Sequence, residues 1–442
     1  MRTKRYLILP IDGIRISDSS IPVPSSARKL LATLQLTPTD VAATKKLAKS
    51  LVATVRTASS AVRRAIASNE SPASGPAIEV IQSLHEDGVK LVSASEEVMA
   101  ALRQENPGIG IIEEKFCHPA RAPRVPVPPR PAKPAGARAA AATSTSVVVE
   151  VLRGDTMKPI KGADVIAFRT SKDAFKKKTN ASGKATFTFA AAVSKLKNVY
   201  VYHEEPGVWG YFKANVKVTS GSVKVILAPL DLATDDSLRF FHKAGNLTDG
   251  AGVRVGVIDS GVDINHINLS LGFDPGVTDD AISDALSKAR KNGILAVAAA
   301  GNDGRLPVGF PGSDSACVGV SAVGRKGSYP NTSTDVQDEV APFGTDPKNY
   351  IAGFSNVGAD LDAAGSGVAV VSTFPGGYGP MSGTSMASPA VAGMAARLLA
   401  SNPAVLSMPR DAARSDAVRK LVIDACKSLG FGVLLEGAGL PQ

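Results

Sequence analysis

Cysteine, aromatic residues and histidine are all scarce in this chain of 442 residues. The three cysteines lie far apart and lack Cys-X-X-Cys spacing, which argues against a disulfide scaffold and a thiolate zinc site. Phe, Trp and Tyr together make up 5% of the residues. No uncharged apolar run reaches the ~18–20 residues that a membrane-spanning helix needs, so we expect no such span.

The remaining composition is that of a globular protein with several domains. Apolar residues make up 44% of the chain, and 41 glycines and 29 prolines favour an α/β protein with linkers. The net charge of +10 is uneven: residues 1–68 carry +9 and residues 231–442 carry −6. Because no nucleic-acid-binding motif accompanies the basic residues, we expect no nucleic-acid partner.

The first apolar stretch, residues 6–11, is too short for the core of a signal peptide. The sequence therefore shows no export signal, and both an exported and a cytoplasmic location stay open.

Residues 1–117 are predicted to form a small α/β region. Residues 6–11 alternate like a strand, and residues 25–67 have helical spacing. Further along, a strand is expected at 88–92, a helix up to Asn106 and a strand at 109–116. Seven prolines then mark residues 118–143 as a semi-rigid linker and a domain boundary.

Residues 144–230 are predicted to form a small β-sandwich, because short β segments alternate with turns. The region is similar to carboxypeptidase-regulatory-like domains and carries no catalytic cluster. The strands are expected at 147–152, 165–168, 185–189, 199–203, 211–218 and 223–227.

Residues 231–442 contain the segments that carry chemistry. Residues 253–258 read as a buried strand that ends at Asp259, and active sites of α/β proteins lie at such strand ends. A helix is expected at 279–291, followed by a strand at 294–300. Asn302 follows that strand between glycines, where its amide can face a reacting oxygen.

A strand at 368–373 leads to a serine-rich string and a helix that continues to Ala400. Ser385 is expected at the N-terminus of this helix, where backbone N–H groups favour negative charge. Gly383 permits close approach of a substrate backbone, and Pro389 is expected in the first turn.

Together these segments resemble the subtilases, the subtilisin-like serine peptidases. The string at 383–389 (GTSMASP) is similar to the family's nucleophile motif, 257–261 (VIDSG) to its aspartate motif, and 300–304 (AGNDG) to its oxyanion-asparagine motif. Residues 267–272 (INLSLG) resemble the strand that pairs with substrate. The resemblance covers about residues 231–442.

The resemblance implies hydrolysis of peptide bonds through an acyl-enzyme. Ser385 would be the nucleophile, Asp259 would orient the histidine base, and Asn302 would hold the oxyanion. The substrate backbone would add as a strand to Ser270, Leu271 and Gly272, with Gly301 near the specificity pocket. Calcium is common in the family, but no aspartate-rich loop indicates a site, so no cofactor is expected.

The chain departs from the family at the histidine. The family order is Asp, His, Ser, but the chain lacks a His-Gly-Thr-His motif and has only five histidines: His85, His118, His203, His242 and His266. Only His266 follows Asp259, and at seven residues' distance we do not expect it to replace the base. Asp259 and Ser385 lie 126 residues apart, against about 190 in the family template.

The missing residues, about 60 by that template, should fall between Asn265 and Ile267. Two functions therefore stay open: a subtilisin-like endopeptidase on Ser385, or a catalytically dead pseudopeptidase or truncated product that binds extended peptides or partner proteins. The expected fold is an incomplete, doubly wound, mostly parallel α/β sheet. It is preceded by the β-sandwich and by an N-terminal region that resembles a propeptide inhibitor and would act within the same chain.

Overall fold

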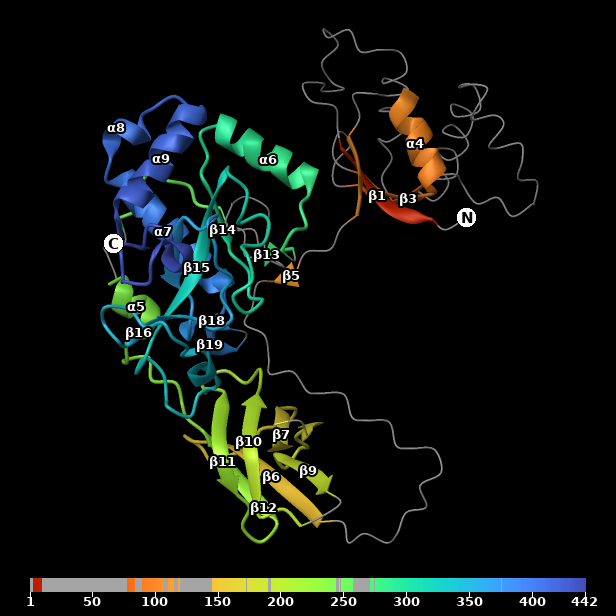
Figure 1. Cartoon of the computed structure of the whole chain (residues 1–442), viewed down its shortest axis with the longest axis vertical. Helices are drawn as coiled ribbons and strands as arrows, with labels where there is room; N and C mark the ends of the chain where they lie inside the picture. The colour runs from red at the N-terminus through yellow and green to blue at the C-terminus, as the bar shows by residue number, and fades with distance from the viewer. Residues whose placement is uncertain are drawn as a thin grey trace, which may run out of the picture. The chain divides into compact units, whose positions relative to one another are not determined.

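The computed structural model describes residues 3–9, 78–83, 90–105, 110–114, 118–119, 145–171, 173–189, 192–243, 246, 248–256, 271–273, 275–374 and 376–442. The chain divides into two compact units (Figure 1). The first comprises residues 1–116 with 279–281, and the second comprises the remaining residues. The helix expected at 25–67 and most of the linker lie outside the described residues.

The first unit contains a four-stranded antiparallel sheet in the order β2-β3-β1-β4. Helix α4 joins β3 to β4, and both strands are antiparallel to β1, which lies between them. The predicted strand–helix–strand element is therefore present, split by an inserted strand. The bounds are β1 Lys4–Leu9, β2 Ile78–Ser83, β3 Lys90–Ala94, α4 Glu96–Glu105 and β4 Gly110–Glu113.

The core of the first unit forms because apolar residues alternate along its strands and so lie on one face of the sheet. Tyr6 and Ile8 of β1 point to one face of the sheet and are buried. Met99 and Leu102 of α4, three residues apart on one helix face, pack in the same cluster.

Residues 145–227 form two sheets that share one apolar core. Strands with alternating buried and exposed residues, such as β9 and β12, turn one face inward. The orders are β11-β10-β7-β8 and β12-β6-β9. The bounds are β6 Thr145–Arg153, β7 Asp164–Thr170, β8 Asp173–Lys178, β9 Lys184–Phe189, β10 Lys195–Tyr202, β11 Tyr211–Lys217 and β12 Ser222–Leu227.

Strand β8 was not expected from the sequence. Its sequence, DAFKKK, is rich in charge, and only Ala174 is buried. The strand forms because β7 pairs with it through a short connection, and its lysines Lys176 and Lys178 flank the buried Asp164.

The C-terminal region is built on a mixed sheet rather than a purely parallel one. Strand β15 (Cys317–Arg325) pairs in parallel with β14 (Ala296–Ala299) and β17 (Ala363–Ser366), and antiparallel with β16 (Asn349–Ile351). All residues of β14, β16 and β17 are buried. Continuous apolar or small residues are what strands covered on both faces require.

Helices cover both faces of this sheet. Val297 packs in the cluster that includes α7 (Thr384–Ala400), whereas its neighbours Ala296 and Ala298 pack with Leu286 of α6 (Asp280–Lys291). A Cβ on Gly365 would lie 2.4 Å from the carbonyl oxygen of Ala387, so glycine allows α7 to approach β17 closely.

Strands β18 and β19 form a hairpin that leads directly into α7. The remaining elements surround the sheet. Their bounds are α5 Ser237–Phe241, the 3₁₀ helix η1 Thr334–Asp338, β18 Val370–Phe374, β19 Gly377–Met381, α8 Pro403–Leu406, α9 Ala412–Asp424, β20 Cys426–Lys427, α10 Val433–Glu436 and β21 Leu440–Pro441.

The strand expected at 253–258 is wrong in its described part, because residues 253–256 have no regular secondary structure. The apolar residues Val253 and Val255 instead line a pocket. Apolar residues predict burial, but a strand also needs a neighbour with matching backbone groups. Among the described residues, β14 pairs with β15 alone.

Candidate active site around Ser385

Ser385 lies in the first turn of α7 and is buried. The hairpin β18–β19 ends shortly before Gly383, which is the residue that precedes α7. Its φ of 155° favours glycine, and no side chain caps the helix at this position. Ser385 therefore lies at the helix end where backbone N–H groups have no carbonyl partner in a preceding turn.

Pro389 lies in the second turn of α7, and not in the first as expected. A proline there cannot donate a hydrogen bond to the carbonyl oxygen four residues earlier, which is that of Ser385. The backbone at the candidate nucleophile is thereby released from one helical bond.

Asn302 follows β14 and contacts the residue before Ser385. Its Oδ1 accepts hydrogen bonds from Thr384 N at 2.9 Å and from Thr384 Oγ1 at 3.0 Å. The Nδ2 group is buried and has no hydrogen-bond partner among the described residues. Buried polar groups are almost always paired. This amide is therefore held in place through its oxygen and keeps its donor available at the N-terminus of α7.

A second asparagine, Asn356, supports this loop and was not identified from the sequence. It is fully buried, its Oδ1 accepts from Asp303 N at 2.8 Å, and its Nδ2 donates to Asp303 Oδ2 at 2.8 Å. Gly301 has a φ of 105°, and a Cβ there would lie 2.4 Å from Asn356 Nδ2. Glycine is required at 301 because the backbone has a positive φ and because a Cβ would clash with Asn356. No sequence pattern distinguishes Asn356 from a surface asparagine.

The loop before Ser385 is also bonded to η1. Ser382 Oγ accepts from Ala369 N at 2.8 Å and donates to Asp335 Oδ1. The loop preceding η1 contacts β11, where Phe212 N donates to Thr332 O at 2.7 Å. Contacts therefore run from the β sheets of residues 145–227 to the candidate nucleophile loop.

Asp338, the last residue of η1, has a perturbed carboxyl group. Burial and the negative charge of Asp335 raise its pKa from 3.8 to about 8. The carboxyl is therefore neutral at a pH where an ordinary aspartate is charged.

The predicted substrate strand is occupied by another segment of the chain. Strand β13 (Leu271–Gly272) pairs antiparallel with β5 (His118–Pro119). In the backbone register, Leu271 pairs with Pro119 and Gly272 pairs with His118. Residues that follow directly on the N-terminal region thus lie along the edge expected to hold substrate.

The structure brings together Asn302, Gly301 and Ser385 through Thr384, which also accepts a hydrogen bond from Gly301 N at 3.2 Å. Asp259, His266 and Ser270 lie outside the described residues, as does His85.

Two histidine side chains lie among the described residues, those of His203 and His242. His203 Nδ1 accepts from Glu205 N at 3.1 Å. Both ring nitrogens of His242 are buried without a hydrogen-bond partner in the described chain, and burial lowers the pKa of His242.

Within the described residues, no group of three or more His, Cys, Asp or Glu side chains is arranged to hold a metal ion. In the same part of the chain, no helix is long and apolar enough to cross a membrane.

Part of the chain is similar to a known protein family. The model of the Subtilase family, Peptidase_S8, matches residues 267–439, a range that includes Asn302 and Ser385 and begins after Asp259 and His266. The chain is similar to Subtilisin NAT of Bacillus subtilis subsp. natto, with 41% identity over 138 residues that cover 31% of each chain. It is also similar to Subtilisin DY of Bacillus licheniformis, with 38% identity over 149 residues, covering 33% of this chain and 45% of the relative.

Among solved structures, the self-cleaved protease domain of PatA matches with 27% identity and a TM-score of 0.29, covering 39% of this chain and 55% of that one. The chain spans about a third to a half of the length of the curated relatives it matches.

Proposed function

Because residues 267–439 of this chain belong to the subtilase family, we propose that the protein is a serine endopeptidase with Ser385 as its nucleophile. The observation that carries this proposal is the amide of Asn302, whose oxygen is fixed by Thr384 and whose nitrogen remains a buried donor. A donor held in advance of the reaction is what an oxyanion site needs, since it costs no reorganisation when charge develops.

In the proposed reaction, Ser385 Oγ attacks the carbonyl carbon of a peptide bond and gives its proton to a base. Negative charge develops on the carbonyl oxygen, where Asn302 Nδ2 and the Ser385 N–H stabilise it. The C–N bond then breaks, the amine leaves with the proton, and water hydrolyses the acyl-enzyme. Asp259 would orient the base, but we assign no histidine to that role.

We propose as the alternative a second function, in which the chain binds extended peptides without cleaving them. His203 Nδ1 accepts a hydrogen bond from Glu205 N, and both ring nitrogens of His242 are buried. Neither of these described histidine side chains is assigned to activate Ser385, and a serine that no base activates is a weak nucleophile. Strand β13 already pairs with an extended segment, so the peptide-binding part of the site does not depend on hydrolysis.

Labelling of the full chain with a fluorophosphonate probe separates the two functions. The endopeptidase predicts covalent labelling that mass spectrometry locates on Ser385 and that Ser385→Ala abolishes. Folded wild-type protein that stays unlabelled contradicts the endopeptidase. In that case, retained binding of an extended peptide supports the second function.

We also propose that residues 1–117 act within the chain as an inhibitor region, followed by a regulatory-like β-sandwich at 144–230. The pairing of His118–Pro119 with Leu271–Gly272 supports the first part, because it covers the proposed substrate edge. The shared core of the two sheets supports the second.

A further inference from the structure

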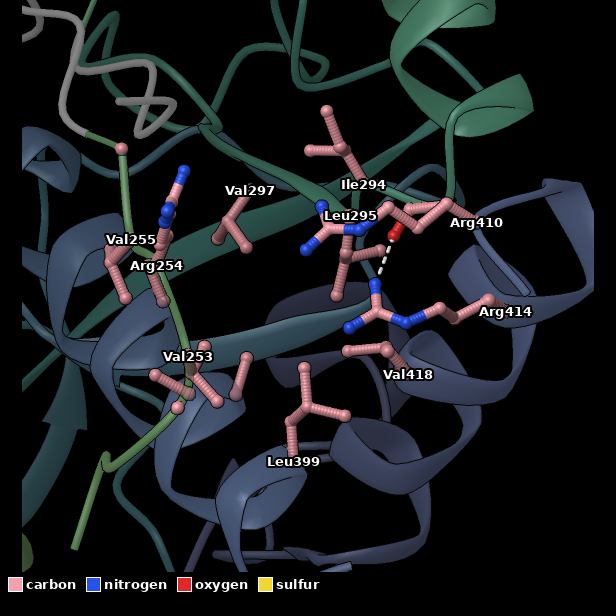
Figure 2. A pocket seen from close by; sticks show the side chains of 16 residues that line it. Val253, Arg254, Val255, Ile294, Leu295, Val297, Leu399, Arg410, Arg414 and Val418 are labelled. Atoms are coloured by element: carbon pink, nitrogen blue, oxygen red, sulfur yellow. Dashed lines mark hydrogen bonds between the residues drawn. The ribbon is translucent and has the colours of Figure 1, made fainter. Parts of the chain in front are cut away.

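A pocket of about 480 Å³ lies at the end of β14 opposite to Asn302. Its walls come from residues 252–256, the chain around Leu295, the C-terminal half of α7, and α9 with the residue preceding its cap (Figure 2). This volume falls in the range of small-molecule sites. The pocket shares no residue with the Ser385 site.

The lining is apolar except for three arginines: Arg254, Arg410 and Arg414. None of the described residues that line the pocket is acidic, and no described carboxylate forms an ion pair with these arginines. Arg254 and Arg410 are exposed, whereas Arg414 is buried, so an anion that binds there would offset mainly the cost of burying the Arg414 charge.

Arg414 is the most informative of the three. It is 8% exposed, its Nη1 donates to Gly293 O at 2.5 Å, and its buried Nε has no hydrogen-bond partner in the described chain. Burial and the charge of Arg410 lower the pKa of Arg414, which reflects two guanidinium groups close together. Figure 2 shows Arg410 and Arg414 extending from the same wall toward the pocket interior.

We propose that this pocket binds an apolar molecule that carries one carboxylate. The carboxylate lies on Arg410 and Arg414, whose planar donors suit bidentate binding of carboxylate oxygens. The apolar part lies along Leu295, Val297 and Leu399. A free medium-chain fatty acid and the C-terminus of a short apolar peptide share this chemistry, and the experiment below distinguishes them.

Titration calorimetry of the full chain with hexanoate, octanoate and decanoate, all below micelle formation, tests the proposal. Binding with one-to-one stoichiometry is expected to tighten about four-fold for each added methylene. Decanol and decylamine, which lack the carboxylate, are expected to bind at least about ten-fold more weakly than decanoate.

Three variants locate the site. Arg410 is exposed, and Arg410→Gln is expected to weaken the affinity for decanoate about 10- to 100-fold. Ala396→Leu adds bulk to the pocket wall and should abolish decanoate binding without removing a charge. Arg397→Gln is the matched control, because Arg397 lies outside the pocket beside Asp249 and its loss should leave affinity unchanged.

A second titration compares a tripeptide such as acetyl-Leu-Val-Leu with its C-terminal amide, to test whether the pocket binds a peptide C-terminus. Binding of decanoate but not the peptide assigns a fatty acid, and binding of the free-acid peptide that Arg410→Gln weakens assigns a peptide terminus. The proposal is overturned if neither decanoate nor the tripeptide binds, if decanol binds as tightly as decanoate, or if Arg410→Gln leaves the affinity unchanged. Ser385→Ala should bind decanoate like wild type, so this result stands apart from the proposed peptidase activity.

Discussion

Replacement of Asn302 by aspartate separates the two roles of this side chain, which are the hydrogen bonds that Oδ1 accepts and the donor that Nδ2 provides. A carboxylate can still accept the hydrogen bonds from Thr384 N and Thr384 Oγ1, which measure 2.9 and 3.0 Å in the native chain. It removes the Nδ2 donor and adds negative charge where the oxyanion would form. Folding should therefore survive while catalysis is lost.

Each effect has an expected size. Loss of one oxyanion donor costs about 10²–10³ in rate, so Asn302→Asp should slow labelling of Ser385 by a fluorophosphonate at least about 100-fold. Its melting temperature should stay near that of wild type. Asn302→Ala should slow labelling similarly and also lose two accepted hydrogen bonds, about 1–3 kcal/mol of unfolding free energy.

The assay is the pseudo-first-order labelling rate at fixed probe concentration, with thermal melts of the same samples. If Asn302→Asp were labelled at the same rate as wild type, the assignment of Nδ2 as the oxyanion donor would be refuted. Equal melting temperatures for Asn302→Ala and wild type would refute the structural role of Oδ1.

Three further predictions concern the surroundings of the site. Asn356→Ala removes both side-chain bonds to Asp303 and should lower the unfolding free energy by about 1–3 kcal/mol, measured by urea denaturation; unchanged stability would show that Asn356 does not support the loop. The folded-state pKa of Asp338, about 8, exceeds its ordinary 3.8, so its stabilising contribution is complete below pH 3.8 and is lost as the pH rises toward 8. Asp338→Asn should flatten this decline in melting temperature, and a parallel decline in both proteins would contradict the shift. Brief trypsin treatment, confirmed by mass spectrometry to cut only within 118–143, should raise peptide binding at Leu271–Gly272 by releasing β5; no change would argue against inhibition by this segment.

Local patterns were enough to predict two helices of the C-terminal region, of which α7 carries Ser385. The helix expected at 279–291 is α6 at 280–291, and the helix expected up to Ala400 is α7, which ends there. Capping residues, charge at helix ends and apolar periodicity act over a few residues, so they can be read without the fold.

Contacts between distant residues could not be read in this way. Asn302 and Thr384 lie 82 positions apart, and Asn356 contacts Asp303 from 53 positions away. The wrong strand at 253–258 has the same cause, because its apolar residues indicated burial but not which neighbour would pair with them. The charged strand β8 was missed because pairing with β7 outweighs its composition.

Hydrolysis of a peptide tests the central claim most directly. The full chain and Ser385→Ala are incubated with an unstructured peptide, and the products are identified by mass spectrometry. Two fragments from wild type, with intact peptide from Ser385→Ala, are the predicted result. Intact peptide from both proteins, or the same fragments from both, would contradict Ser385 as the nucleophile of a peptidase.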